Sequence, residues 1–257
     1  MYIKKVGILF NTRKEWAGKL SREVSEFLRY SGFRIVKTSA DATICIGGDG
    51  TILYYNSLGA IEGTVLGIGS STSHICALRN DNWKEELIVV LKNNKSESRL
   101  CIFASVSGKT GKTGKTKSGK NKKTKNKSAG FVNIPAINDI VVHTTDYRVI
   151  TIYVNINGIP HEFSGDGIII STPTGSSAYA YSAGGDILDQ KARLIEVIPI
   201  CPYKRTISHM VLDENAEILI SSNRDADLII DGIYIKRLKD KESVKVKKGK
   251  DVKFLVL

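Results

Sequence analysis

The sequence predicts an α/β N-terminal domain followed by a β-rich C-terminal domain, over a chain of 257 residues. Up to residue 92, apolar runs typical of strands alternate with segments in which apolar residues recur at helical spacing. Such alternation indicates a parallel sheet covered by helices. From residue 93 onward the apolar runs are short, strand-like and separated by turn signals. Hydrophobic residues make up 42% of the chain and charged residues 25%, which is the composition of a folded globular protein.

The first half contains expected strands and helices in alternating order. Residues 19–30 have apolar side chains at helical spacing, and Gly32 follows as a stop signal. The other expected helices cover 51–58 and 83–92, and strands are expected at 5–10, 33–37, 42–46 and 64–68. These elements define a first domain over residues 1–92.

The second half is expected to consist mainly of strands. Residues 99–107 alternate as a strand would, and residues 131–171 are almost all strand-like, with turn signals at Asn157-Gly158 and Gly165-Asp166-Gly167. Further short strands are expected at 217–221, 226–230, 233–236, 243–246 and 252–256. We assign residues 93–235 to a second domain and leave the strands of 236–257 without a domain.

The net charge of +12 is concentrated in one segment of low complexity. Residues 108–128 hold nine lysines, no acid and no apolar side chain, so that the rest of the chain carries only +3. Such a segment cannot bury enough surface to fold, which predicts a disordered loop between two strands. It resembles a P-loop over 114–121, but Asn121 stands where a serine or threonine would bind magnesium. We interpret it as a solvated loop, with contact to nucleic acid or another polyanion as the alternative.

The cysteines and the hydropathy favour a cytoplasmic protein. The chain has four cysteines without a CxxC pair, and the four histidines add no metal-ligand spacing. We expect buried, reduced thiols, which suit a reducing compartment. The N-terminal apolar run is too short for a signal peptide, and no run approaches the ~20 residues of a membrane span. The expectation is a soluble protein that enters no membrane.

The first candidate site is a glycine-rich turn between a strand and a helix. Gly47, Gly48 and Gly50 surround Asp49 and let the backbone approach a ligand closely, while Thr51 begins the expected helix. Free amides at the start of a helix can face phosphate oxygens. Asp49 is then placed to hold a cation or to take a proton from an attacking hydroxyl. The alternative is a plain turn in which Asp49 caps the helix.

Two further segments combine polar side chains with buried strands. Residues 165–185 read as a strand, a turn rich in Thr, Gly and Ser, and a helix of small residues, which suits an anion or a flat polar ligand. Asn138 and Asp139 stand between apolar stretches, where an ordinary turn or bulge is the alternative to a site. Arg13 and Lys14 follow the first strand, where they could reach phosphates or remain solvated charges. Asp231-Gly232 reads as a hairpin turn, with a site acid as the alternative.

In order along the chain, these motifs resemble those of NAD kinases. They are GGDGT, the Asn-Asp pair, Asp-Gly before an apolar strand, TPTGSSAYAYSAGG and the IPICP of 198–202, spread over about residues 3–235. GGDGT is shared with diacylglycerol, sphingosine and phosphofructokinase-type enzymes, whereas TPTGSSAYAYSAGG is much more specific. The resemblance implies an active site between the two domains. It also implies transfer of a phosphoryl group from ATP, or polyphosphate, to the 2′-hydroxyl of the adenosine ribose of NAD, giving NADP.

The resemblance assigns roles to individual residues. Asp49 matches the catalytic aspartate of the family, and Asn138 and Asp139 match the pair that binds the dinucleotide. The remaining matches on the NAD side are Gly50, Asp166, Thr174, Ser177, Ala178, Tyr179 and Ser182. Phosphate or ATP contacts are expected from Gly47, Gly48, Thr51 and Arg13. The resemblance further implies Mg²⁺ or another divalent cation with ATP, and a homodimer or homotetramer.

Two other functions compete with this interpretation. A lipid or sphingoid-base kinase of the same superfamily would need an apolar cleft, which the hydroxyl-rich segment 172–182 disfavours. A nucleic-acid-binding protein would need basic and aromatic residues within the fold, whereas the fold is nearly balanced in charge without the lysine segment. His143, His161, His209 and Asp186 are expected to be structural residues, and His74 is expected to be a surface loop residue, with contact to substrate as the alternative.

Overall fold

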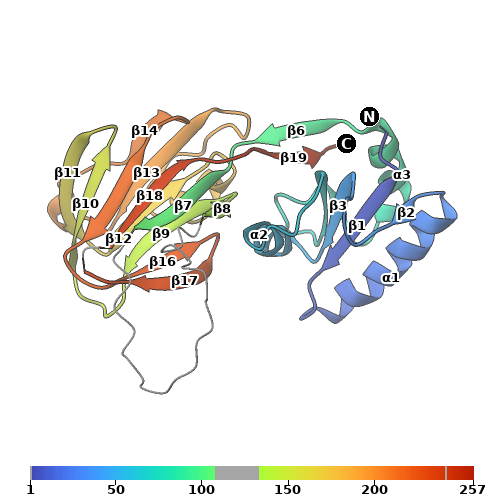
Figure 1. The fold of residues 1–257 in the computed structure, drawn as a ribbon, viewed down its shortest axis with the longest axis horizontal. Coiled ribbons are helices and arrows are strands. Elements are labelled where there is room, and N and C mark those ends of the chain that lie inside the picture. Colours follow the sequence, from blue (N-terminus) through green and yellow to red (C-terminus); the bar gives the residue numbers. More distant parts are fainter. Residues whose placement is uncertain (1, 108–132, 241) are drawn as a thin grey trace, which may run out of the picture.

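The fold was analysed in a computed structural model that describes residues 2–107, 133–240 and 242–257. The lysine-rich segment predicted at 108–128 lies outside these residues. The described chain forms an α/β part and a β-rich part that lie side by side (Figure 1). Both parts have the character that the sequence predicts.

The α/β part is built on a seven-stranded sheet, called here the N-terminal sheet. Its strand order is β2 (Arg34–Ile35), β1 (Lys5–Phe10), β3 (Ala42–Ile46), β4 (Thr64–Gly69), β19 (Val252–Leu255) and β6 (Ser96–Arg99), with β5 (Leu78–Arg79) also paired to β4. All of these pairs are parallel except the one between β19 and β6. The parallel strands bring the loops after β1, β3 and β4 to one edge of the sheet.

Helices cover both faces of the N-terminal sheet because its central strands are buried on both sides. α1 (Glu15–Tyr30) and α3 (Trp83–Asn93) share one apolar cluster with alternate residues of β3, among them Ile44 and Ile46. α2 (Asp49–Ser57) shares the opposite cluster with Cys45. α2 therefore lies on the face that meets the β-rich part (Figure 1).

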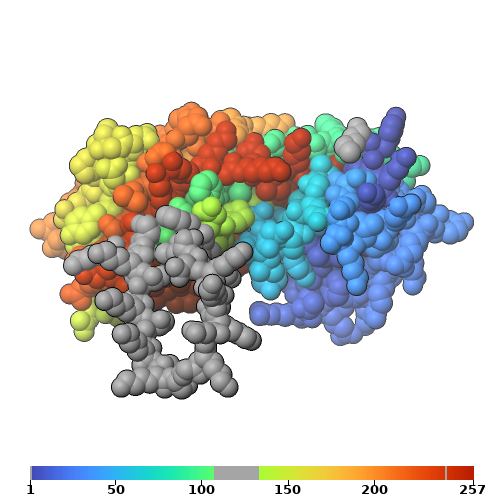
Figure 2. Space-filling model, viewed as in Figure 1, coloured from blue at the N-terminus to red at the C-terminus, as the bar shows by residue number. Residues whose placement is uncertain are grey.

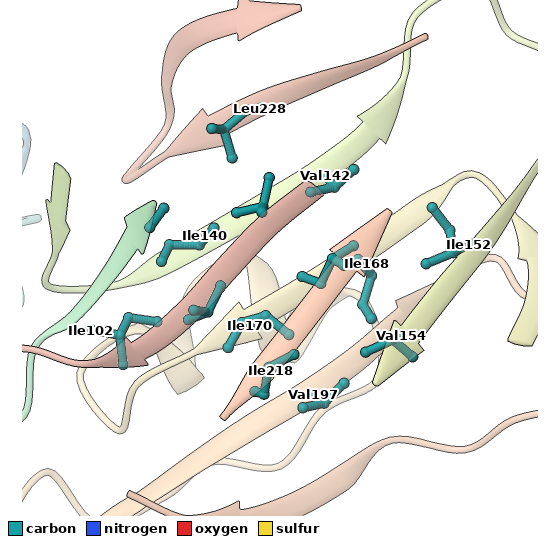
Figure 3. Packing of buried hydrophobic residues seen from close by; sticks show 14 of the residues in the cluster. Ile102, Ile140, Val142, Ile152, Val154, Ile168, Ile170, Val197, Ile218 and Leu228 are labelled. Atoms are coloured by element: carbon teal, nitrogen blue, oxygen red, sulfur yellow. The ribbon is translucent and has the colours of Figure 1, made fainter. Parts of the chain in front are cut away.

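The β-rich part is a sandwich of two six-stranded antiparallel sheets. The β10 sheet has the order β11 (Ile159–Gly165), β10 (Ile150–Ile156), β15 (Ile218–Ser222), β18 (Ser243–Lys248), β7 (Ile102–Ser107) and β8 (Ile134–Ala136). The β12 sheet has the order β14 (Met210–Asp213), β13 (Leu194–Ile200), β12 (Gly167–Ser171), β9 (Asp139–Thr144), β16 (Ala226–Ile230) and β17 (Ile233–Leu238). Figure 3 shows the core between them, with Ile140 and Ile168 from the β12 sheet and Ile152 and Ile218 from the β10 sheet.

The chain passes between the two parts at two adjacent points, from β6 to β7 and from β18 to β19. β6 and β19 belong to the N-terminal sheet, whereas β7 and β18 belong to the sandwich. At the crossing the Gly249 amide donates to the Cys101 carbonyl over 2.7 Å. The first domain is expected to end at residue 92, whereas the N-terminal sheet also contains β6 and β19. The expected strand 99–107 and the unassigned segment 236–257 are therefore divided between the two parts. The C-terminal residues, red in Figure 2, accordingly reach the α/β part.

The outer face of the β12 sheet is covered by a compact segment of small residues. It contains a 3₁₀ turn over Gly175–Ser177 and the four-residue helix α4 (Tyr179–Ser182), which is shorter than the helix expected there. Ala180 packs on Val141, Ile169 and Ile198 of the sheet. Among the described residues, no helix is long and apolar enough to cross a membrane.

Candidate active site

The turn between β3 and α2 can be built only with glycine at its first two positions. Gly47 and Gly48 have φ values of +140° and +100°, which L-residues rarely adopt. A Cβ atom at Gly47 would lie 2.6 Å from Asn11 Cβ and 2.6 Å from Thr51 Oγ1. The glycines therefore let the turn run flush against the end of β1 and start α2 at Asp49.

Three backbone amides hold the Asp49 carboxylate. The amides of His74, Ile75 and Cys76 donate to it, at 2.6 Å to Oδ2, 3.0 Å to Oδ1 and 3.2 Å to Oδ1. Asp49 is half-buried, and Oδ2 accepts only one of these bonds, so that it can accept another. The carboxylate is thus fixed in position while one oxygen keeps acceptor capacity for a ligand.

The cation at the glycine turn is Lys14. Its ammonium donates to the Gly47 carbonyl over 2.8 Å and lies 3.9 Å from the position of a Cβ at Gly48. Arg13, the predicted phosphate ligand, is exposed, and its backbone amide donates to Asn11. Gly50 is exposed with open space beside it, and the buried Thr51 has a hydroxyl without a hydrogen-bond partner.

The Asn138-Asp139 pair is anchored by the carboxylate of Asp231. The amides of Ile137, Asn138 and Asp139 donate to this carboxylate over 2.9, 2.7 and 3.0 Å. Asp231 and Gly232 form the expected hairpin turn between β16 and β17, with φ values of +50° and +75°. Asp231 therefore both shapes a turn and fixes the backbone of the pair.

Asp139 and Asp231 form a buried pair of acids in which one carboxyl group ionises more readily than the other. Asp139 is 5% exposed, and burial together with the neighbouring Asp231 raises its pKa to about 7. Burial also raises the pKa of Asp231, but its three amide donors favour the ionised form. We infer that Asp231 carries the charge and that Asp139 holds the proton near neutral pH.

The segment after β12 closes over Asn138. The Thr172 amide donates to the Asn138 carbonyl over 2.9 Å, and the Thr172 hydroxyl donates to the carbonyl of Ile137. A Cβ at Gly175 would lie 2.3 Å from the Asn138 carbonyl oxygen, so this position also requires glycine. Asn138 Oδ1 and the hydroxyl of buried Thr174 are left without partners. Unsatisfied buried groups of this kind point to a ligand or water that completes them.

The other predicted dinucleotide residues lie on the accessible side of this segment. Ser177, Ala178, Tyr179 and Ser182 are all exposed. Desolvation raises the pKa of Tyr179, with smaller contributions from Cys201, Asp139 and Asp166. Asp166 is half-buried between β11 and β12, where its amide donates to the Ile200 carbonyl. Tyr179 thus lies in the small-residue segment that covers the outer face of the β12 sheet, within electrostatic range of Asp139 and Asp166.

An apolar contact joins the Asp49 turn to the Asn138 strand. Ile137 packs in one cluster with Ile52 of α2 and with Ile75 and Cys76, whose amides hold Asp49. Asn56 of α2 also donates to the Pro135 carbonyl over 3.5 Å. The structure therefore brings the two predicted groups of site residues to the junction between the α/β part and the sandwich.

Known NAD kinases are similar to this chain in sequence. A model of the ATP-NAD kinase C-terminal domain matches residues 137–256. Over 97% of its length the chain is 28% identical to an NAD kinase of Lachnoclostridium phytofermentans, 92% of which is covered. It is 29% identical to an NAD kinase of Chloroherpeton thalassium, over 84% of this chain and 72% of the relative. The C-terminal part of the chain thus matches the ATP-NAD kinase C-terminal domain, and nearly the whole chain is similar to NAD kinases.

Solved structures of the NAD kinase family share the fold. Yeast NADH kinase, solved with NADH, superimposes with a TM-score of 0.84 at 18% identity, covering 100% of this chain and 84% of the yeast chain. An NAD kinase of Archaeoglobus fulgidus, solved with ATP, gives a TM-score of 0.75 at 19% identity, covering 98% of this chain and 93% of that one. The α/β part and the β-rich part are thus arranged as in this family.

A sizeable cavity of the described residues lies away from the Asp49 turn. It has a volume of about 860 Å³ and is lined by Asp41 and Gly63, before β3 and β4, and by Cys101 and Asp251 at the chain crossings. Asp49 lies at the opposite, carboxyl ends of the same strands. In open parallel sheets ligands bind at the carboxyl ends, so the site assignment rests on the residue contacts and not on cavity size.

Three features of the site did not follow from the sequence. The carboxylate of Asp231 anchors the Asn138-Asp139 backbone, whereas its Asp-Gly sequence indicates a turn, with a site acid as the alternative, and does not identify this anchor. Lys14, and not Arg13, contacts the glycine turn, because the bend after β1 decides which side chain faces it. Finally, the structure groups His209, Asp186 and Glu196, which have no suggestive spacing in the sequence.

The raised pKa of Asp139 predicts a specific pH dependence of stability. Because the folded-state pKa exceeds the unfolded value, its contribution is full below about pH 4 and is lost as the pH rises through about 7. Asp139→Asn cannot ionise, so we expect its melting temperature relative to wild type to increase steadily between pH 4 and pH 8. Thermal unfolding followed by circular dichroism measures this difference. A difference that stays constant with pH would show that Asp139 does not exchange a proton in this range.

Removing the Asp231 carboxylate should destabilise the protein strongly. Asp231→Ala leaves three backbone amides without their acceptor, and each unsatisfied buried donor costs roughly 1–3 kcal/mol. We expect a loss of at least about 3 kcal/mol in the free energy of unfolding, measured in urea. Asp231→Asn keeps one oxygen and tolerates the left-handed turn, so its loss should be smaller. Equal losses in the two variants would argue that the turn, and not the amide anchor, matters.

Proposed function

We propose that this chain is an NAD kinase, which transfers the terminal phosphoryl group of ATP to the 2′-hydroxyl of the adenosine ribose of NAD and releases NADP and ADP. The observation that carries the proposal is the Asp49 carboxylate, held by three amides at a glycine turn beside the Asn138-Asp139 pair. The names of the relatives support it, as do the ligands named for the two solved structures, NADH for the yeast enzyme and ATP for the Archaeoglobus enzyme.

In the proposed reaction Asp49 acts as the general base. Its Oδ2 atom accepts the proton of the 2′-hydroxyl as the hydroxyl oxygen forms a bond to the γ-phosphorus and the bond from that phosphorus to the β,γ-bridging oxygen breaks. Phosphoryl transfer depends mainly on positioning and charge stabilisation, which a carboxylate fixed by backbone amides provides. The free acceptor capacity of Oδ2 supports this role.

The donor phosphates are proposed to bind at the glycine turn. Gly47, Gly48 and Gly50 leave the backbone accessible at the start of α2, where free amides favour anions. Lys14 supplies a positive charge in contact with the turn, while Thr51 and Arg13 remain candidates for further contacts. Mg²⁺ or another divalent cation would arrive bound to the oxygens of the ATP phosphates, and the Asp49 carboxylate could hold it only in place of its role as the base. Polyphosphate would use the same groups.

The dinucleotide is proposed to lie along the outer face of the β12 sheet. Asn138 Oδ1 and the Thr174 hydroxyl, both without partners, would bind polar groups of the ligand, and protonated Asp139 can donate a hydrogen bond. Asp139 pairs with Ser171 at one end of β12 and Asp166 precedes its other end, so the two acids are roughly 15 Å apart. Only an extended ligand reaches both, with Ser177, Ala178, Tyr179 and Ser182 along its path.

The remaining properties are extensions of this proposal. The exposed hydroxyls of 177–182 disfavour a lipid kinase, and the nucleic-acid alternative depended on a segment outside the described residues. The four cysteines are free thiols, three of them buried, which supports a cytoplasmic location. A homodimer or homotetramer is proposed by analogy with the family.

The direct test incubates the protein with NAD, Mg²⁺ and either ATP or polyphosphate and measures NADP by liquid chromatography. Absence of NADP with both donors would refute the proposal.

Asp49→Asn should fold but lose most of its activity. Loss of a general base costs about 10²–10⁴-fold in rate, and we expect kcat to fall within this range. Asp81→Asn replaces an exposed acid on the same part and should leave kcat unchanged. Circular dichroism and thermal unfolding check the fold of both variants. A variant at Asp49 that keeps more than half of the wild-type kcat would exclude the carboxylate from the mechanism.

Asp166→Ala and Tyr179→Ala should weaken the use of NAD more than the use of ATP. Both residues lie on the proposed path of the dinucleotide, so we expect KM for NAD to rise about tenfold, which corresponds to about 1.4 kcal/mol. Tyr181→Ala removes another exposed aromatic from the same short helix and serves as the control. Kinetics with each substrate varied in turn separates the two constants. An effect confined to KM for ATP would reverse the assignment of the two substrate positions.

A further inference from the structure

Three metal-ligating side chains from separate elements meet above the outer face of the β12 sheet. Asp186 follows α4, Glu196 lies on β13 and His209 directly precedes β14. One ligand atom from each lies within 4.8 Å of the others, and His209 Nε2 is 3.0 Å from Asp186 Oδ2. The imidazole and the Asp186 carboxylate are partly exposed, so an ion can reach the group from solvent.

Glu196 is an unusual residue for its position in the sheet. Its side chain is fully buried, on the same face as the apolar residues Ile198 and Ile200. Oε1 accepts the Asp186 amide over 2.7 Å, whereas Oε2 is buried with no hydrogen-bond partner. An ionised carboxylate with an unpartnered buried oxygen is costly, and a bound cation would remove this cost.

The backbone over Glu196 is shaped to the carboxylate. A Cβ at Gly185 would lie 2.7 Å from Glu196 Oε1 and 3.0 Å from Oε2. Only glycine lets the chain pass this close, and Gly184 before it has a φ of +98°. This bend places Asp186 directly beside Glu196. The charged groups that act on Glu196 are His209 and Asp186, so no described lysine or arginine neutralises it.

We propose that Asp186, Glu196 and His209 bind a divalent transition-metal ion of the Zn²⁺ class. One imidazole nitrogen and two carboxylate oxygens match the mixed ligands of Zn²⁺, and three protein ligands leave a fourth position for water. The imidazole disfavours Mg²⁺ and Ca²⁺, which prefer oxygen ligands. The ion ties the segment after α4 to β13 and β14. The proposal does not depend on the kinase function.

The test titrates Zn²⁺ alone into chelator-treated, dialysed full-length protein by calorimetry. We expect one ion per chain with a Kd of about 1 μM or tighter and a higher melting temperature with zinc. His209→Ala, at a partly exposed position, and Glu196→Gln should each weaken binding at least tenfold and remove the thermal shift. His161→Ala, on edge strand β11, should behave as wild type. Cys201, an exposed thiol, is present in every variant and cannot produce these differences.

A spectroscopic measurement separates binding at this group from binding elsewhere. Co²⁺ in a site with an imidazole and carboxylates shows visible absorption, which should develop with one equivalent in wild type and disappear in His209→Ala. The proposal is overturned if 100 μM Zn²⁺ does not bind, or if His209→Ala binds with the same Kd and stoichiometry. In either case the three side chains would be a hydrogen-bonded group without a metal.

Discussion

The site depends on one carboxylate, that of Asp231, which accepts three consecutive backbone amides. It fixes the conformation of residues 137–139, and two other contacts require that conformation. Ile137 points into the cluster that holds α2 and the amides around Asp49, while the carbonyls of Ile137 and Asn138 receive the segment after β12. This anchor therefore fixes the backbone segment that contacts the α/β part, the sandwich and the small-residue segment.

The three neighbouring aspartates differ in burial and hydrogen bonding, and therefore in what their carboxyl groups can do. Asp49 and Asp231 each accept three amides, yet Asp49 keeps an oxygen toward solvent and Asp231 is enclosed. Asp139 lies at the same junction, but burial and the charge of Asp231 leave it with a proton near neutral pH. One carboxylate keeps acceptor capacity, one is structural, and one has a pKa raised to about 7.

Much of this arrangement can be predicted from local sequence patterns. The alternation of strands and helices, the glycine turn before α2 and the Asp-Gly hairpin depend on residues close together in the sequence, and the structure contains all three. The pairing of β19 with β4 and the grouping of Asp186, Glu196 and His209 depend on contacts between distant segments. Glu196 illustrates the limit, because a single polar residue in an apolar strand reads as an outward-facing side chain, whereas here Gly185 and Asp186 cover it.

The return of β19 to the N-terminal sheet has a consequence for synthesis of the protein. β4 and β6 are translated before most of the sandwich, but β19, which pairs with both of them, is translated only after the sandwich strands. During translation the α/β part therefore carries an unpaired edge on β4, the kind of exposed strand that invites aggregation. The N-terminal sheet can be completed only when residues 252–255 have been synthesised, so the edges of β4 and β6 that pair with β19 stay accessible to chaperones while the sandwich strands are translated.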